Sequence, residues 1–517
     1  MSNPNKRKDK KTESGFAKKT DYKWLGVGIV VFILIAYLLP LPESMLQKAN
    51  DIFPNLSQDR RDFVGSPENL ALHIQYIVAL LAMCTVFFAT EAIPMPAVAL
   101  IIGLVQLFFG ITHPSKIVGT YAHDAVWFIA GSLAIGATLV KYGLDKRIGM
   151  LVINLAGSKT RMIVLALLLG TAIPSAFINE ASIAPMYVPI AIALFTLTNK
   201  TTPAPRLGKL LMMSIAIGCM AGAPMSPTGG ARNAIMIGFL SNIGIDVSFT
   251  QWLSMGVFYT VILSVVMAFV LPLIFKPEVN DLSAAVGMLK QDLEKHGKMT
   301  GKQWLVAGIM VLAIFMWITD KSITQSILGF PLGLGGIAIA ICVLYMLLRL
   351  TSWKDYEQNV SWGVIILYAG AISLGSVFKT SGAAGWVADS ILKIMEPLGI
   401  DKGLPLVILV AAIGAVLTNL MSAGATVAVI GPVVLDMAQS SGTNPLLVGV
   451  GLAIATSMAF WLVIGTPASS IVYASGKLDA KDFIRMATIA WPVAMVGIIA
   501  MIGFYWVVIL QIPIFIQ

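Results

Sequence analysis

The chain has 517 residues, of which 57% are hydrophobic and only 12% are charged, and its formal net charge is +9. Soluble globular proteins carry roughly 25% charged residues, so this composition argues against a soluble enzyme and indicates a chain that crosses a membrane many times. The three cysteines, Cys84, Cys219 and Cys342, lie singly in apolar stretches, which argues against a disulfide framework or a cysteine zinc site.

Residues 1–23 are polar and strongly basic, and no cleavage pattern of a signal peptide follows the first apolar segment. We expect a disordered cytoplasmic tail that acts as a topology signal. Binding of nucleic acid by this tail is the less favoured alternative, and we expect no nucleic-acid partner.

Apolar segments of spanning length follow in chain order. We expect full spans near residues 24–42, 73–91, 96–112, 124–141, 208–240, 253–274, 303–319, 332–350, 361–379, 447–476 and 485–511. Two further apolar regions, 162–196 and 404–437, are too long for one span. Small and polar residues interrupt each of them, at 174–182 and at 418–426. A re-entrant helical hairpin that enters and leaves on one side fits each region better, because irregular backbone at membrane depth is tolerated only inside protein or along a wet cavity.

The basic residues are distributed unevenly along this map. With the N-terminus in the cytoplasm, 26 of the 35 Lys and Arg residues fall in cytoplasmic segments, 8 fall outside, and Arg232 lies within a span. This bias follows the positive-inside rule. We therefore expect a multi-pass inner-membrane protein whose N-terminus is cytoplasmic and whose C-terminus is outside.

The two halves resemble each other in an order that predicts inverted repeats. Glycines at 131, 136 and 143 recur with the same spacing at 370, 375 and 382, and each set precedes one of the two hairpins. Each hairpin is followed by a long span that is broken in the middle, at 223–230 and at 465–470. Paired hairpins and broken helices indicate a transporter site between two repeats. We expect a first repeat at 24–275, a cytoplasmic linker at 276–302 and a second repeat at 303–517.

The backbone and side-chain groups at the breaks and at the hairpin tips are of kinds that bind small ions. The N-terminus of a half-helix carries partial positive charge and favours an anion, whereas exposed backbone carbonyls favour a cation. The residues expected to bind substrate are Asn179, Glu180, Arg232, Asn233, Ser422, Thr466 and Pro467. Those expected to bind a coupling cation, Na⁺ being the possible metal ion, are Ser175, Asn179, Gly229, Thr418, Ser422 and Gly465.

Glu180 and Arg232 are ionisable residues at membrane depth, where charge is costly and usually functional. Arg232 could hold a carboxylate or sulfate in the fork of its guanidinium while Glu180 takes part in cation or proton coupling. Alternatively, the two residues form an internal ion pair that only joins the hairpin to the broken helix.

Three sequence matches resemble the divalent anion/sodium symporter family, whose members carry dicarboxylates, citrate or sulfate. Residues 90–96, Thr-Glu-Ala-Ile-Pro-Met-Pro, resemble its TEAIP segment, and residues 465–469 resemble its GTPPN break, as do 229–233 more loosely. The Ser-Asn-Thr signature at each hairpin tip is replaced, by residues 179–181 and 422–424, and Arg232 stands where the family has a proline of the break. The apolar segments predict an all-α polytopic membrane protein with about 11 spans. The resemblance implies a homodimer in which a mobile transport domain moves against a scaffold like an elevator.

We therefore expect a secondary active transporter of a small anion, such as a dicarboxylate, another organic acid or sulfate. It would be coupled to Na⁺ or H⁺ or work as an anion exchanger, without an organic cofactor. The main alternative is a cation/proton antiporter of related architecture. An enzyme is disfavoured, because no catalytic triad, phosphate-binding loop or metal-ligand cluster occurs in the sequence.

Overall fold

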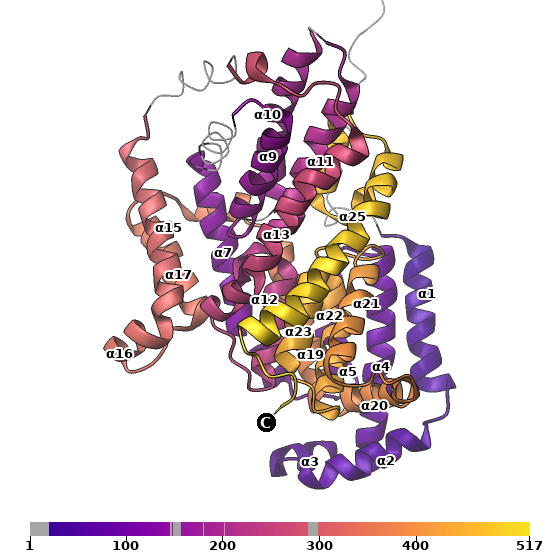
Figure 1. Cartoon of the computed structure of the whole chain (residues 1–517). Helices are drawn as coiled ribbons and strands as arrows, with labels where there is room; N and C mark the ends of the chain where they lie inside the picture. The colour runs from indigo at the N-terminus through magenta and orange to yellow at the C-terminus, as the bar shows by residue number, and fades with distance from the viewer. Residues whose placement is uncertain are drawn as a thin grey trace, which may run out of the picture. The chain divides into compact units, whose positions relative to one another are not determined.

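The computed structural model describes residues 20–144, 147, 157–178, 180–200, 202–287 and 298–516. Most of the expected tail and Asn179 lie outside these residues. Within them the chain is almost entirely helical, and strand-type pairing is limited to two isolated bridges, Lys159–Asp281 and Thr443–Phe515 (Figure 1). The prediction of an all-α fold is confirmed.

The chain divides into two compact units, which are described separately. Unit 1 comprises residues 1–121 and 363–383, and unit 2 comprises residues 122–362 and 384–517. The helices of unit 1 are α1 (Tyr22–Ile33), α2 (Glu43–Ile52), α3 (Gln58–Val64), α4 (Pro67–Thr90), α5 (Met95–Phe108), α6 (Pro114–Tyr121) and nearly all of α19 (Trp362–Thr380). A π-helical turn, Leu34–Leu38, extends α1, and a 3₁₀ turn, Phe53–Asn55, follows α2.

Unit 2 contains the remaining helices. They are α7 (Asp124–Lys141), α9 (Thr160–Ser175), α10 (Glu180–Asn199), α11 (Pro205–Gly222), α12 (Ala231–Asn242), α13 (Phe249–Phe275), α15 (Gly301–Thr319), α16 (Gln325–Leu328), α17 (Gly333–Leu347), α18 (Trp353–Asn359), α20 (Ala383–Met395), α21 (Gly403–Leu417), α22 (Ala423–Ser440), α23 (Pro445–Ala455), α24 (Pro467–Ala474) and α25 (Ala480–Ala500). Short 3₁₀ turns lie at Pro227–Gly229, Glu396–Leu398 and Val463–Gly465, and π-helical turns at Asp320–Thr324 and Met501–Ile509.

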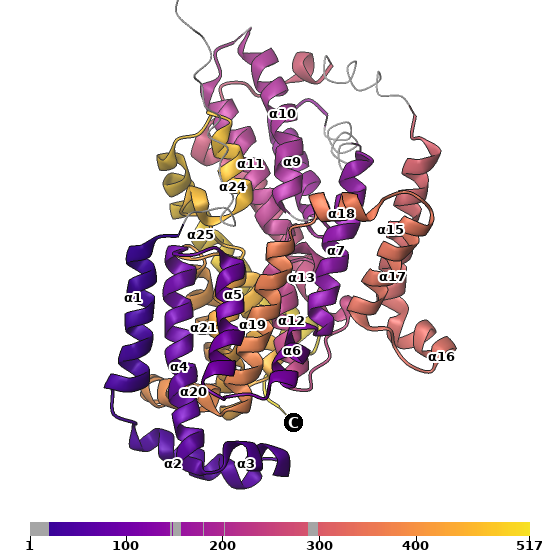
Figure 2. The ribbon, with the colours of Figure 1, turned by 180° about the vertical axis from the view of Figure 1, so that it is seen from behind.

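Helix α4 is the long span of unit 1, and local sequence explains where it begins and ends. Ser66 caps its N-terminus by accepting a hydrogen bond from the backbone N–H of Asn69, and Pro67 occupies the first turn, where no N–H partner is required. The helix stops at Thr90 because Glu91 adopts a left-handed conformation with φ of 49°. The segment that resembles the TEAIP motif is therefore the turn from α4 into α5. Figure 2 shows α1, α4 and α5 side by side.

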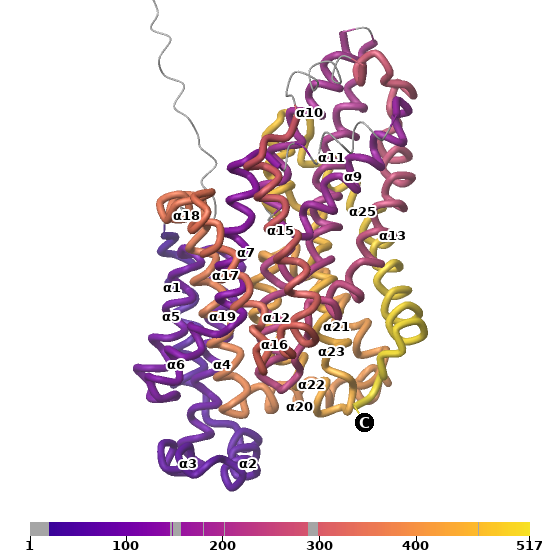
Figure 3. The backbone as a smooth tube through the Cα atoms, turned by 90° about the vertical axis from the view of Figure 1, so that its left-hand side faces the viewer, coloured from indigo at the N-terminus to yellow at the C-terminus, as the bar shows by residue number. Residues whose placement is uncertain are grey.

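The first glycines of the two repeated sets make matching contacts with helices of the opposite repeat. On α7, a Cβ added at Gly131 would lie 2.5 Å from Cβ of Ala338 on α17. On α19, a Cβ added at Gly370 would lie 2.5 Å from Cβ of Ala99 on α5. Each glycine lets two helices approach closely. One helix of each repeat therefore packs against the other repeat (Figure 3). Helix α7 of the first repeat packs along α17 of the second, and α19 of the second repeat packs on α5 of the first.

The first hairpin is formed by α9 and α10, and both of its ends lie beside the segment that follows α13. At its entry, the Thr160 N–H donates to the Asn280 carbonyl at 2.9 Å. Just beyond its exit, Glu278 accepts hydrogen bonds from the backbone N–H groups of Arg206 and Leu207, both at 3.0 Å. The expected re-entrant hairpin at 162–196 is therefore confirmed.

The second hairpin is formed by α21 and α22 and closes in the same way. The Gly403 N–H at its entry donates to Thr443 Oγ1 at its exit, at 2.8 Å. In both repeats the first arm packs along the helix that precedes the break, α9 on α11 and α21 on α23. The second arms pack across the repeats, because α22 lies against α12 and α10 lies against α24.

Eight helices in the described residues are long and apolar enough to cross a membrane, and the number rises to as many as ten if each of two bent helix pairs is one span. The bent pairs are Tyr22–Leu38 with Glu43–Asn55, at 76°, and Ala383–Leu398 with Gly403–Leu417, at 116°. The expected spans 208–240 and 447–476 are each divided in two, and α12, α23 and α24 have 12, 11 and 8 residues. Each half of a broken span is too short to be recognised as a membrane-crossing helix by its length alone.

Candidate functional site

The break between α11 and α12 follows directly from its sequence. Pro224 and Pro227 lack the N–H that a continuous helix needs, and the chain forms only a 3₁₀ turn before α12 begins at Ala231. The freed carbonyl of Pro224 accepts a hydrogen bond from Trp252 Nε1 at 3.1 Å, and Gly256 leaves room for the loop against α13. The break is thus held in place by α13.

The same break is joined to the tip of the first hairpin. Ser226 Oγ donates to the Ala176 carbonyl, and Thr228 Oγ1 donates to that carbonyl at 2.9 Å. A Cβ on Gly229 would lie 3.0 Å from the carbonyl oxygens of both Ser175 and Ala176 and would overlap the carbonyl of Ala223. Three backbone oxygens therefore converge on Gly229. Hard oxygen ligands of this kind suit a small cation such as Na⁺.

Asn233 stabilises the break from the first turn of α12. Its Nδ2 donates to the carbonyls of Ala223, at 2.8 Å, and Ser226, at 2.7 Å. The residue is fully buried, and its Oδ1 has no hydrogen-bond partner in the described part of the structure. Because buried polar atoms normally have partners, this oxygen is available to a ligand.

Glu180 and Arg232 lie close enough to interact electrostatically. Glu180 begins α10, its Oε2 is buried, and that oxygen has no hydrogen-bond partner among the described residues. Arg232 is 4% exposed, in the first turn of α12, and has interactions of its own. The ion pairs of the described residues do not include one between these two side chains. The predicted internal ion pair is therefore not seen in this part of the structure.

The second break runs from the end of α23 at Ala455 to the start of α24 at Pro467, so the expected position, 465–470, is mostly too late in the chain. Pro467 fits the first turn of a helix, where its missing N–H is not needed.

The second break is joined to the second hairpin by a different set of bonds. Thr418 Oγ1 donates to the Thr456 carbonyl at 2.8 Å. Asn419 Nδ2 donates to the Met458 carbonyl at 3.2 Å, and its Oδ1 accepts from the Trp461 N–H at 3.0 Å. The tip and the break are thereby held together at three points.

Two further residues of the second repeat act as helix caps. Thr466 Oγ1 accepts from the Ser469 N–H at 3.1 Å and so caps α24, whose first residue is Pro467. Ser422 Oγ accepts from the Ala425 N–H at 3.3 Å and caps α22. Gly465 has no room for a side chain, since a Cβ there would lie 2.9 Å from the Ala459 carbonyl.

The two repeats meet through two contacts near the breaks. A Cβ on Gly424, just past the second tip, would lie 3.1 Å from Cβ of Ala231 at the start of α12. Ser457 Oγ, in the second break, donates to Tyr259 Oη at 3.4 Å, and Tyr259 interacts electrostatically with Arg232. The structure thus gathers Ser175, Gly229, Asn233, Glu180 and Arg232 at the first break and Thr418, Ser422, Gly465, Thr466 and Pro467 at the second.

Three side chains that connect tips to breaks, Ser226, Thr228 and Asn419, are absent from the residues expected to bind ligands. A sequence signal existed for each. Ser226 and Thr228 lie within the proline-rich break, and Asn419 is a single amide in an otherwise apolar region next to the expected Thr418. Small polar groups at such positions seldom occur in a span without a role.

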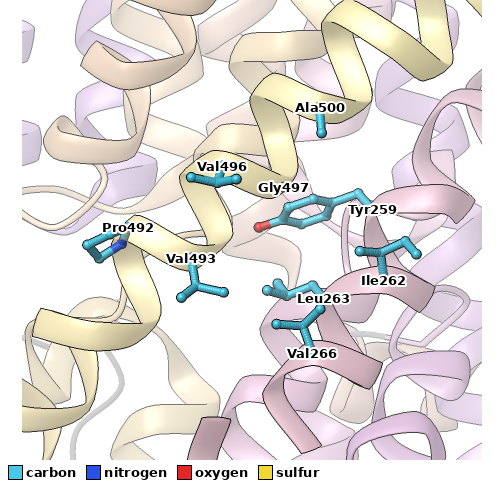
Figure 4. Close-up of a pocket in the computed structure, with 9 residues that line it drawn as sticks. All are labelled: Tyr259, Ile262, Leu263, Val266, Pro492, Val493, Val496, Gly497 and Ala500. Carbon is cyan, nitrogen blue, oxygen red and sulfur yellow. The ribbon is translucent and has the colours of Figure 1, made fainter. Parts of the chain in front are cut away.

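An apolar cavity of about 440 Å³ opens between α13 and α25 (Figure 4). Side chains of Ile262, Leu263, Val493 and Val496 line it, and Tyr259 forms part of its wall. Tyr259 also contacts Ser457, so this residue touches both the apolar cavity and the polar second break.

The sequence matches a known protein family and several known transporters. A family description entitled sodium:sulfate symporter transmembrane region matches residues 62–512. The chain is 26% identical over 456 residues to the sodium-dependent dicarboxylate transporter SdcS of Staphylococcus saprophyticus, covering 84% of this chain and 86% of the relative. It is also 26% identical over 462 residues to SdcS of Staphylococcus aureus strain USA300, with the same coverage.

Solved structures of similar fold are transporters as well. The antimetabolite efflux pump MtrF of Neisseria gonorrhoeae has a TM-score of 0.58 at 14% identity, with 87% of this chain and 96% of MtrF covered. The YdaH transporter of Alcanivorax borkumensis has a TM-score of 0.55 at 14% identity, with 85% and 98% covered. At this identity the likeness concerns the fold.

Proposed function

This chain belongs to the sodium:sulfate symporter family, and we propose that it is a secondary transporter that moves a small organic dianion across the inner membrane, driven by Na⁺. Membership makes it a multi-pass membrane transporter rather than an enzyme. The dianion and the driving ion are suggested by the relatives, which are named sodium-dependent dicarboxylate transporters.

One observation carries the proposal: each broken helix is bonded to the tip of a re-entrant hairpin of its own repeat. The carbonyls of Ser175, Ala176 and Ala223 that converge on Gly229 would hold Na⁺. Because two of these oxygens belong to the hairpin and one to the break, the ion would stabilise their contact. Binding of Na⁺ would therefore shape the site before the anion enters, which is the basis of coupling.

Arg232 occupies the position at which the family has a proline, and it would bind the anion. Its guanidinium is buried in the first turn of α12, where the helix terminus adds partial positive charge. Such a group can hold a carboxylate by two parallel hydrogen bonds. The Oδ1 of Asn233 would accept a hydrogen bond from a substrate hydroxyl or from a protonated carboxyl group.

Arg232→Ala and Glu180→Gln test this assignment in proteoliposomes that take up labelled succinate or sulfate under an imposed Na⁺ gradient. Arg206→Ala and Glu357→Gln serve as matched controls, because Arg206 is an exposed residue paired with Glu278 and Glu357 is exposed on α18. Loss of the charged hydrogen bonds of Arg232 is expected to reduce uptake about 10- to 100-fold. If both site variants transport as well as the controls with unchanged cation dependence, the assignment is wrong.

Glu180 supports one alternative function, an antiporter that exchanges a cation for protons. A buried carboxylate oxygen without a hydrogen-bond partner in the described chain is a natural site for a proton or a metal cation. Na⁺/H⁺ exchange in vesicles without any anion would favour this alternative. If the Glu180→Gln variant still takes up anion in a saturable, Na⁺-dependent manner, the symporter would be favoured.

Three further features are part of the proposal. A homodimer would hold one unit of each subunit fixed while the other moves like an elevator across the bilayer. The N-terminus would be cytoplasmic and the C-terminus outside, as the charge bias predicts. The repeat boundaries would be those expected from the sequence, with residues 276–302 as the linker between them.

A further inference from the structure

Several buried polar atoms of unit 1 have no hydrogen-bond partner in the described part of the chain. They are Arg60 Nε, Arg60 Nη2, Arg61 Nε, His73 Nδ1 and Thr112 Oγ1, of which all but Arg61 Nε enter the site described below. None of the motifs that define the transport site uses these residues. A buried donor without a partner destabilises the folded state, and a charged one does so more strongly, so such a concentration points to a missing ligand.

The chain holds Arg60 in place through the opposite side of its guanidinium. Arg60 Nη1 donates to the Ile111 carbonyl at 3.0 Å, in the turn between α5 and α6. This bond fixes the head group next to Thr112. Phe63 lies beneath the guanidinium, with its ring centre 5.8 Å from Cζ, and packs edge-on against His113.

The Nε–Nη2 edge that remains is the edge with which an arginine binds an oxyanion by two parallel hydrogen bonds. His73, in the second turn of α4, lies close enough to Arg60 for the two to interact electrostatically. No carboxylate in the described chain forms an ion pair with Arg60. Burial lowers the pKa of Arg60 from its ordinary value, yet a guanidinium remains charged near neutral pH.

We propose that Arg60, His73 and Thr112 form a binding site for a phosphate-type oxyanion. Two sources supply this chemistry. The site lies where α4, a candidate span, begins, which is the depth at which the phosphate of a lipid head group would meet it. Free inorganic phosphate or sulfate would make the same contacts from solution.

Binding can be measured on the full-length protein in detergent without any transport assay, so the result does not depend on the proposed function. Inorganic phosphate is titrated against lipid-stripped protein by calorimetry, and the phospholipid that co-purifies is quantified by native mass spectrometry. The variants are Arg60→Gln, His73→Gln and Thr112→Val. Arg206→Gln is the control, because that arginine is exposed and already paired.

If free anion is the ligand, phosphate binds wild type and the control and binds Arg60→Gln at least tenfold more weakly. If lipid is the ligand, phosphate has little effect, and phospholipid co-purifies with wild type and the control but is lost from Arg60→Gln. Either result supports the site. Thr112→Val removes the hydroxyl, and His73→Gln replaces the imidazole by an uncharged amide of different shape. Both should weaken the same signal several-fold even if Arg60→Gln fails to fold.

Three results would overturn the proposal. One is the absence of both phosphate binding and retained phospholipid in wild type. Another is binding of equal strength in wild type and in all three variants. The third is conversion of a dimer to monomers by Arg60→Gln with no change in either ligand, which would assign Arg60 to a contact between subunits.

Discussion

Thr228 Oγ1, in the first broken helix, donates a hydrogen bond of 2.9 Å to the Ala176 carbonyl at the tip of the first hairpin. Ser226 Oγ donates to the same oxygen and also lies 2.8 Å from Thr228 Oγ1. The hairpin and the broken helix therefore share one hydrogen-bonded cluster, and its acceptor is one of the three carbonyls proposed to hold Na⁺. Changes in this cluster are expected to alter cation dependence before they alter the anion site.

Replacing Thr228 by Val keeps the shape of the side chain and removes the hydroxyl. Loss of one buried hydrogen bond, worth about 0.5–1.5 kcal/mol, is expected to raise the Na⁺ concentration for half-maximal uptake about 3- to 10-fold. The rate at saturating Na⁺ should change little. Initial uptake rates measured over a series of Na⁺ concentrations check this. Thr488→Val is the control, since its exposed hydroxyl bonds only to the helix backbone, and an equal shift there would contradict the explanation.

Gly229→Ala is expected to abolish Na⁺-dependent uptake. Its methyl group would overlap the Ala223 carbonyl and crowd those of Ser175 and Ala176, so the three oxygens could not keep their arrangement. Uptake and Na⁺-induced thermal stabilisation should be lost together. The matched change is Gly497→Ala on α25, where an added Cβ meets no atom within 4 Å and activity should persist. Retention of Na⁺ stabilisation by Gly229→Ala would count against the cation site.

Gly131→Val and Gly370→Val should destabilise the protein to a similar extent. Each added side chain would press on an alanine of the neighbouring helix, Ala338 or Ala99, whose backbone also lies close. Overpacking of this kind costs about 1–3 kcal/mol. Thermal unfolding of the purified variants measures the effect. Gly308→Val on α15 meets open space and serves as the control. A loss of stability in only one of the two glycine variants would mean that their contacts are not equivalent.

Asp355→Asn tests an electrostatic contact outside the spans. The Ser352 hydroxyl, together with Lys141 at 2.9 Å, holds the pKa of Asp355 well below its usual range. A carboxylate with a depressed folded-state pKa contributes stability that is present above its unfolded pKa of about 3.9 and is lost as pH falls further. The variant should unfold about 1–3 °C below wild type at neutral pH. The difference should shrink below about pH 4, and a difference that stays constant with pH would rule out this cause.

The sequence was sufficient to predict the hairpins and the broken helices because their causes are local. Regions 162–196 and 404–437 are too long for one span, and prolines such as Pro224 and Pro227 cannot continue a helix. The exchange of α7 and α19 between repeats could not be predicted in this way, because Gly131 and Ala338 are distant in the chain and glycine spacing does not identify a partner. The contacts of Asn419 with the second break also depend on tertiary packing. The same holds for Arg60 and His73, which meet only because α3 folds back on α4.

The position of α19 has a consequence for biosynthesis. Gln106 on α5 donates to Ser373 on α19 at 3.0 Å, a contact that joins residues 267 positions apart. At a translation rate of about 5–20 residues per second, Ser373 is synthesised roughly 10–50 s after Gln106. The Gln106 amide lacks this partner for that time. During that interval α5 lacks the contacts with α19 that Gln106 and Ala99 make in the folded protein. A truncated chain that ends before α19 would therefore remain a client of insertion chaperones and quality-control proteases.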